Sequence, residues 1–193
     1  MILFAFILAG ILIGLLANWR HGKKNDFQGI SRIHGLWLPI AGVLLHGSFS
    51  FLPNFALHYA GIITCTGYLC IFSFLFLNRK KKLPIAFMAA GSLSNFSVIA
   101  ANGFRMPVSP ASLAMYPGMT AEAVYARRVN YFIAQNGAHL YFLGDIIPVP
   151  LRTLGGFISV GDLLLGFGLL LFIVWVLTEA QGDDRNEDLP AAS

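Results

Sequence analysis

The chain has 193 residues, of which 56% are hydrophobic and 11% are charged. Soluble domains carry about 25% charged residues, so this composition excludes a soluble monomeric protein. The formal net charge of +4 is no sign of nucleic-acid binding, because the basic residues cluster at the ends of apolar runs, as the positive-inside rule predicts. We therefore expect the lipid bilayer as a partner and no nucleic acid.

The apolar runs are continuous and do not alternate with polar residues, which predicts an all-α, polytopic transmembrane helix bundle. The first run has no basic residues before it and no small-residue cleavage pattern after it, so we interpret it as a retained span and not as a signal peptide. We expect one integral membrane domain over 1–180 and a disordered acidic tail over 181–193. The predicted five spans are about 2–17, 36–51, 56–77, 83–101 and 159–178.

The loops between these spans predict the orientation. Segments 18–33 and 78–82 contain four basic residues each. Segment 52–55 contains none, and the long stretch 102–158 contains four. Short basic loops stay in the cytoplasm. The N-terminus is then outside, the C-terminus is cytoplasmic, and 102–158 lies on the outer face.

The long outer stretch is expected to contain two further elements. Thr120 resembles a helix N-cap and Gly137 a C-terminal stop. Between them Val124, Tyr125, Val129, Phe132 and Ile133 would share the apolar face of an amphipathic helix on the membrane or bundle. Residues 139–147 are apolar but too short to span, which favours a re-entrant or interfacial segment. A six-span alternative uses 131–147 as a helix and places the C-terminus outside.

Asp162 begins the last apolar run, where an unpaired carboxylate is costly. Ser159 stands three residues earlier, and this spacing predicts a capping box in which each side chain bonds the backbone N–H of the other residue. The negative charge of Asp162 also complements the positive end of the helix dipole at the N-terminus. We favour this structural role. The alternative is that Asp162 binds a cation or ligand, or moves protons.

Asp145 lies between apolar residues ahead of Pro148, and it is expected to cap that turn or to pair with Arg105 or Arg152. Asn102-Gly103 predicts a tight turn with positive φ. Arg105 would then lie at the outer interface, where it can snorkel or reach Asp145 or Asp162. The polar residues that could form a ligand site or a structural cluster are Asn102, Arg105, Asp145, Ser159 and Asp162.

Two Gly-Asp pairs also suggest a catalytic alternative. Aspartyl intramembrane proteases use one aspartate on each of two helices, because two carboxylates that share a proton activate water. Ser159 stands where the first glycine of their Gly-x-Gly-Asp motif would be, so the analogy is weak. Convergence of Asp145 and Asp162 would support it.

No cofactor or metal is predicted. The five histidines have no ligand partner at i+3 or i+4. Cys65 and Cys70 point in different directions on a helix, which predicts packing residues and not a disulfide.

Three blocks together resemble a family of bacterial multi-pass membrane proteins that is catalogued only as a domain of unknown function. They are Ala101-Asn102-Gly103-Phe104-Arg105-Met106-Pro107-Val108, Phe142-Leu143-Gly144-Asp145-Ile146-Ile147-Pro148 and Ile158-Ser159-Val160-Gly161-Asp162-Leu163-Leu164. The resemblance implies a bacterial cytoplasmic membrane and no particular activity. It also suggests that the outer ends of the last two spans and the Asp145 segment form one unit. The first block departs from the pattern at Phe104, where a second glycine is expected.

The resulting hypothesis is a non-enzymatic binding, accessory or scaffold protein whose specific surface lies on the outer face. Its partner would be another membrane protein or a second copy of the chain. The alternative is a membrane enzyme or small transporter that uses Asp145, Asp162 and Arg105.

Overall fold

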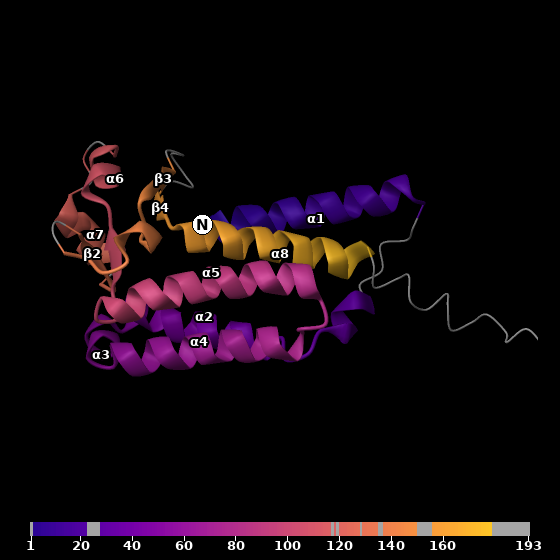
Figure 1. The fold of residues 1–193 in the computed structure, drawn as a ribbon, viewed down its shortest axis with the longest axis horizontal. Helices are drawn as coiled ribbons and strands as arrows, with labels where there is room; N and C mark the ends of the chain where they lie inside the picture. The colour runs from indigo at the N-terminus through magenta and orange to yellow at the C-terminus, as the bar shows by residue number, and fades with distance from the viewer. Residues whose placement is uncertain are drawn as a thin grey trace, which may run out of the picture.

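Five long helices lie side by side along the long axis of the molecule (Figure 1). They are α1 (Ile2–Arg20), α2 (Trp37–Phe51), α4 (Ala60–Leu77), α5 (Lys82–Ala101) and α8 (Val160–Thr178). The computed structural model describes residues 2–22, 28–116, 118, 120–127, 129–134, 137–149 and 156–178. Within these residues, α1, α4, α5 and α8 are long and apolar enough to cross a membrane, whereas α2 has only 15 residues. The helices indicate a membrane protein.

The short elements gather at the two ends of the bundle. One end contains η1 (Gln28–Arg32) and the turn between α4 and α5, and we call it the basic end. The opposite end contains α3 (Pro53–His58) and a folded cap made from the described residues of 102–158. The elements of the cap are β1 (Met106–Val108), α6 (Pro110–Ala114), α7 (Ala121–Arg127), β2 (Tyr131–Ile133), η2 (Tyr141–Leu143), β3 (Ile147–Val149) and β4 (Gly156–Ile158).

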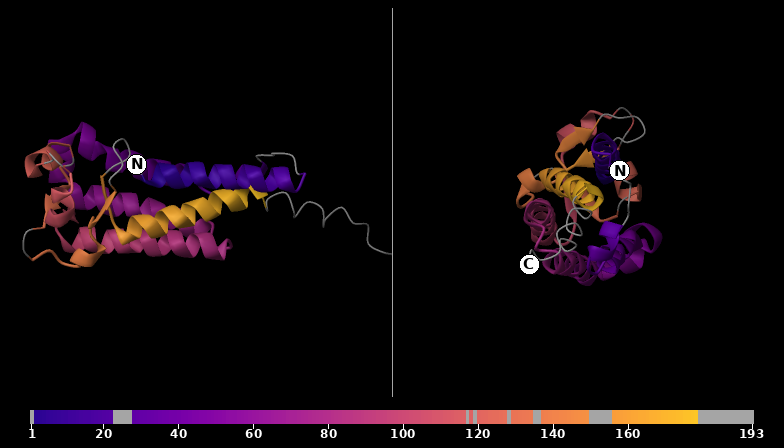
Figure 2. Two further views of the ribbon diagram at one scale, coloured as in Figure 1. Left: turned by 90° about the horizontal axis from the view of Figure 1, so that it is seen from above. Right: turned by 90° about the vertical axis from the view of Figure 1, so that its right-hand side faces the viewer.

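α8 lies between α1 and α5 and packs closely against both (Figure 2). Glycines permit this approach. A Cβ atom at Gly91 of α5 would lie 2.5 Å from both the carbonyl oxygen of Gly161 and the backbone nitrogen of Leu165. A Cβ atom at Gly10 of α1 would lie 3.0 Å from the carbonyl oxygen of Leu170. Between apolar helices in lipid, close backbone packing replaces the hydrophobic effect as the attractive force.

The apolar core has separate clusters along the bundle. Near the basic end, one cluster joins four helices through Leu38, Phe74, Leu75, Ile85, Met88, Phe172 and Val176. Near the cap end, Phe49, Ala56, Ala60 and Ile63 join α2, α3 and α4. Since α2 contributes to both, it runs the length of the bundle from the basic end to the cap end.

The cap contains two small sheets, so the prediction of an all-α fold is wrong for this part. β1 and β2 pair in parallel, with Pro107 opposite Phe132. β3 and β4 pair antiparallel, with Pro148 opposite Phe157. The cap has its own buried cluster of Val108, Val124 and Ile133. Aromatic and β-branched residues such as these favour strands when a partner strand is available.

The predicted amphipathic helix is correct only at its start. Thr120 caps α7 by accepting a hydrogen bond from the backbone N–H of Ala123 at 3.2 Å. The helix ends at Arg127, and Phe132 and Ile133 belong to β2 instead. Gly137 has a positive φ of 83°, but it follows the strand and does not end a helix, so the predicted helix stop is wrong. Pairing with β1 therefore overrides the helical periodicity of this segment.

Other expectations about the spans also change. The third predicted span is divided into α3 and α4 at Tyr59, whose backbone leaves the helical conformation with φ −104° and ψ 24°. Pro53 restricts Leu52 and so sets the start of α3. The described residues between 131 and 147 form β2, η2 and the start of β3, and no helix that would support the six-span alternative. The re-entrant or interfacial segment expected over 139–147 stays a prediction; the helical element within it is η2, with three residues. The predicted tail, 181–193, lies outside the described residues.

Replacing Gly91 with alanine should separate α5 from α8, because the new methyl group meets backbone atoms that cannot rotate away. We expect a loss of about 1–3 kcal/mol in the free energy of unfolding, the usual cost of overpacking. Thermal unfolding in detergent measures this effect. Gly47→Ala is the matched control, because its Cβ atom would lie 3.8 Å from the nearest neighbour. Equal melting of the two variants would contradict the proposed close contact.

Candidate functional site

The predicted capping box at the start of α8 is confirmed. The backbone N–H of Asp162 donates to Ser159 Oγ at 2.9 Å, and the backbone N–H of Ser159 donates to Asp162 Oδ2 at 3.2 Å. The carboxylate thus satisfies a backbone donor that the first turn of a helix leaves unpaired. Asp162 therefore has a structural role that requires no ligand.

Asn95 of α5 completes this arrangement, and the sequence analysis did not identify it. Its Nδ2 donates to Asp162 Oδ1 at 2.7 Å, and its Oδ1 accepts a hydrogen bond from Ser159 Oγ at 2.7 Å. One amide thus bonds both members of the capping box and ties α5 to α8. A lone asparagine inside an apolar span was the available signal, because such a group needs a partner within the bundle.

Gly161 explains why the third block contains a glycine between its serine and its aspartate. A Cβ atom at Gly161 would overlap Asn95 Oδ1, and it would lie 2.8 Å from the carbonyl oxygen of Gly91. Any larger residue would displace the Asn95 amide from Ser159 and Asp162. One contact with α5 therefore involves Ser159, Gly161 and Asp162. We call these three residues and Asn95 the α5–α8 junction.

The α5–α8 junction lies well inside the bundle. Asn95 precedes Asn102, where α5 ends, by seven positions, which is about 10 Å along a helix that rises 1.5 Å per residue. Ser159 is fully buried, whereas Asp162 is partly exposed. α8 therefore begins below the end of α5, and the cap occupies the remaining depth (Figure 1).

Asn102 holds the cap to the end of α5. Its Nδ2 donates to the carbonyl oxygens of Val98 and His139, at 2.7 and 2.8 Å, and its Oδ1 accepts from the backbone N–H of His139 at 3.0 Å. The expected positive φ at Gly103 is confirmed, at 64°. Phe104 has φ 63° as well. The backbone at Phe104 thus has the left-handed conformation that glycine adopts most readily, at the position where the resemblance leads us to expect a glycine.

Arg105 does not form the expected contact with the aspartates. Its Nη2 donates to the carbonyl oxygen of Tyr131 at 2.7 Å, and its guanidinium lies 5.8 Å from the ring centroid of Phe132. Within the described part of the chain, the Arg105 guanidinium has its hydrogen bond to Tyr131 and none to Asp145 or Asp162. Arg105, which directly precedes β1, therefore stabilises the pairing of β1 with β2 through its hydrogen bond to Tyr131.

Asp145 is buried and extends the strand pairing of the cap. Its backbone N–H donates to the carbonyl oxygen of Pro107 at 2.9 Å, and its carbonyl oxygen accepts from Ser109 at 3.2 Å. Gly144 permits this approach, because a Cβ atom there would lie 2.7 Å from the Pro107 oxygen. Arg152, its other predicted partner, is outside the described residues. Asp162 bonds Asn95 and Ser159 and not Asp145 in the part of the chain that the structure describes.

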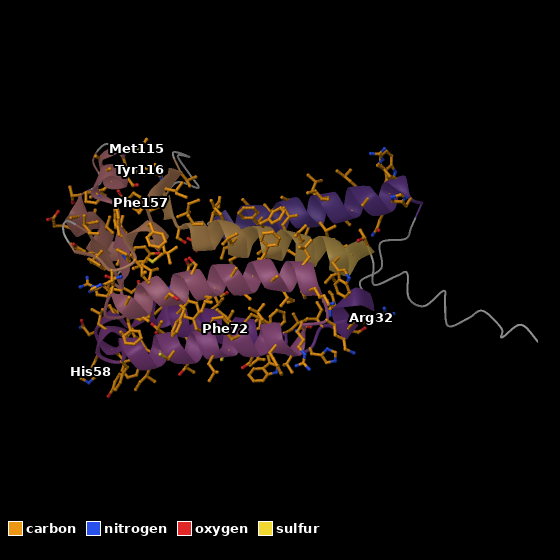
Figure 3. All side chains as sticks on the ribbon, in the orientation of Figure 1. Arg32, His58, Phe72, Met115, Tyr116 and Phe157 are labelled. Carbon is orange, nitrogen blue, oxygen red and sulfur yellow. The ribbon has the colours of Figure 1, made fainter. Side chains whose placement is uncertain are left out.

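The three sequence blocks therefore meet in space. The first and second are joined where Val108 pairs with Asp145, and the second and third where Ile147 pairs with Ile158. Tyr116, after α6, also joins the start of β4. Its hydroxyl donates to the Gly156 carbonyl oxygen at 2.7 Å and accepts from the Gly156 N–H at 3.2 Å. Figure 3 shows Tyr116 beside Phe157 at the cap end, with Arg32 at the other end. The cap is thus one folded unit on α5 and α8.

Two ionisable groups outside the long helices have shifted pKa values. Burial and the neighbouring Lys80 lower the pKa of Lys81, whose Nζ lies 4.4 Å from the ring centroid of Trp175. Hydrogen bonds from its own backbone N–H and from Thr120 lower the pKa of the exposed Glu122. Neither group adjoins the α5–α8 junction. Among the described residues, no cluster of three His, Cys, Asp or Glu side chains could hold a metal ion.

This fold defines a membrane protein with several apolar helices and a folded cap at one end. The chain belongs to a family of unknown function (DUF5317), whose sequence model matches residues 31–174. The match confirms the expected resemblance to a family without an assigned activity and includes all three blocks. No curated protein and no solved structure matches the chain.

Replacing Asn95 with leucine should weaken the α5–α8 junction, because Ser159 and Asp162 would each lose a partner inside the bundle. We expect a loss of about 1–3 kcal/mol in unfolding free energy, the usual cost of leaving buried polar groups unsatisfied. Melting in detergent measures it. Ser94→Ala is the control, because Ser94 Oγ is buried without a hydrogen-bond partner among the described residues, so its loss should change melting little.

A double-mutant cycle tests whether Asn95 and Asp162 act as one unit. Asp162→Asn should lower the melting temperature modestly, because an amide cannot accept at both of its terminal atoms. Combined with Asn95→Leu, it should cost clearly less than the sum of the two single effects, since both remove the same hydrogen bond. Strict additivity would show that this bond contributes nothing to stability.

Proposed function

We propose that this protein is a non-enzymatic component of the bacterial cytoplasmic membrane that binds a protein partner through its cap, as a binding, accessory or scaffold protein. The observation that carries the proposal is the use of Asp162. Both carboxylate oxygens accept hydrogen bonds from the protein itself, and the Ser-x-Gly-Asp block serves the contact with Asn95. The most distinctive residues of the chain thus position the cap on the spans.

The construction of the cap supports a recognition role. It is fixed at three points, by Asn102 at His139, by Arg105 at Tyr131 and by Tyr116 at Gly156. A surface held this firmly presents its exposed side chains with little loss of entropy on binding. Met115 and Tyr125 are both exposed large side chains of the cap. The partner is another membrane protein with an exposed domain, or a second copy of this chain.

The catalytic alternative lacks the geometry that would favour it. An acid–base pair needs a carboxylate whose oxygens are available to water or substrate. Asp162 instead bonds Asn95 and Ser159, and Arg105 bonds Tyr131. No observation on the described residues assigns either aspartate a reacting group, so we do not propose an enzyme or a transporter.

The proposed topology has five spans, with the cap outside and the C-terminus in the cytoplasm. α2 is short for a span, but it connects the basic end to the cap end beside α4. The described basic residues Arg20, Arg32, Arg79 and Lys80 all lie near the basic end. Such a concentration favours the cytoplasmic side.

Cysteine labelling tests the orientation. Lys80 is exposed at the basic end, whereas Lys81 is partly covered by Trp175, so Lys80→Cys is the better reporter. In a background without Cys65 and Cys70, we expect Lys80→Cys to react with an impermeant maleimide only after the cells are opened. Met115→Cys should react in intact cells. The opposite pattern would invert the proposed topology.

Photo-crosslinking in living cells tests the proposed partner. A photoreactive amino acid at Met115 or Tyr125 of the cap should give a protein adduct of defined mass, identified by mass spectrometry. The control position is Leu93 of α5, which is exposed on the side of a span and should give no discrete protein adduct. A tagged second copy distinguishes self-association from another protein. Absence of any adduct at both cap positions would overturn the proposal.

A further inference from the structure

A group of three consecutive large apolar side chains is exposed on the cap. Leu140 is 40% exposed, Tyr141 is 37% exposed and Phe142 is 63% exposed. Leu140 directly precedes η2, and Tyr141 and Phe142 are its first two residues. We call these three residues the η2 ridge. Isolated exposed apolar residues are common on soluble surfaces, but a run of three is a feature that requires a cause.

The depth of the ridge follows from its neighbour Leu143. Leu143 packs against Val98 and Ile99, which precede the end of α5 at Asn102 by four and three residues. These positions lie about 5–6 Å inside the end of the helix. η2 therefore lies against the last turn of α5.

The protein holds the ridge in this place by several contacts. Asn102 bonds the backbone of His139 in both directions, directly before Leu140. Leu140 has a left-handed backbone with φ 51°, a conformation that is unfavourable for a non-glycine residue. The backbone N–H of Leu143 donates to the Leu140 carbonyl oxygen at 2.9 Å. These hydrogen bonds on both sides of Leu140 fix the backbone of the ridge within the cap.

We propose that the η2 ridge inserts among the lipids of the leaflet on the cap side of the membrane. η2 packs beside α5, which is one of the helices long and apolar enough to cross a membrane. Leucine and phenylalanine suit the acyl region, and tyrosine suits the boundary with the headgroups. Insertion buries the ridge and fixes the cap against the bilayer. This inference rests on α5 as a span and not on the proposed protein partner.

Site-directed fluorescence in liposomes tests this inference on the purified full-length protein. Phe142→Cys and Tyr141→Cys, each in a background without Cys65 and Cys70, carry an environment-sensitive probe. We expect a blue-shifted emission, quenching by lipids with a nitroxide on the acyl chain, and protection from aqueous iodide. The liposomes contain only phosphatidylethanolamine and phosphatidylglycerol, so no other protein can cover the ridge.

Two matched positions calibrate the result. Met115→Cys is an aqueous reference, because Met115 is 59% exposed elsewhere on the cap. Native Cys65, exposed on α4, is the reference within the membrane. Emission and quenching at both ridge positions that match Met115 would overturn the proposal. So would a probe protected from both quenchers, since that result means that protein covers the ridge. Two ridge positions keep the test valid if one substitution disturbs folding, which melting reveals.

Discussion

The hydrogen bonds of Asn95 to Ser159 and Asp162 are the interaction on which the rest of the structure depends. They set the height at which α8 begins against α5, about 10 Å below the end of α5. Because α8 begins there, the chain before it must remain outside the helical bundle over the last turns of α5. Of the cap elements, β1 and η2 contact α5 there, and β4 leads directly into α8.

The same chemistry recurs along the bundle. Asn18 of α1 donates to the Leu177 carbonyl oxygen of α8 at 2.9 Å, and Asn78 bonds the backbone of His34 in both directions. With Asn95 and Asn102, these side chains tie elements that are distant in the sequence. An amide both donates and accepts, so it satisfies backbone or side-chain partners without introducing a charge into an apolar environment. In this bundle, asparagine side chains therefore join elements that are distant in the sequence without a charged pair.

The glycines and the asparagines depend on each other. Gly91 and Gly161 allow α5 and α8 to approach until backbone atoms nearly touch, and only at this separation can the Asn95 amide reach both Ser159 and Asp162. Gly144 does the same for the second block, where it lets the Asp145 backbone pair beside Pro107. The three sequence blocks therefore contain packing and hydrogen-bonding units that position the cap on α5 and α8.

The sequence by itself determined the apolar helices, their approximate limits, the basic end and the capping box, because hydropathy, charge and cap spacing are local properties of the chain. Only the tertiary structure decided the partner of Asp162, the strands of the cap and the contact of Arg105 with Tyr131. Residues 124–133 have a helical apolar periodicity, yet 131–133 form β2 because β1 offers a strand to pair with. Pairing across many residues cannot be read from local periodicity, and neither can the depth at which one helix begins beside another.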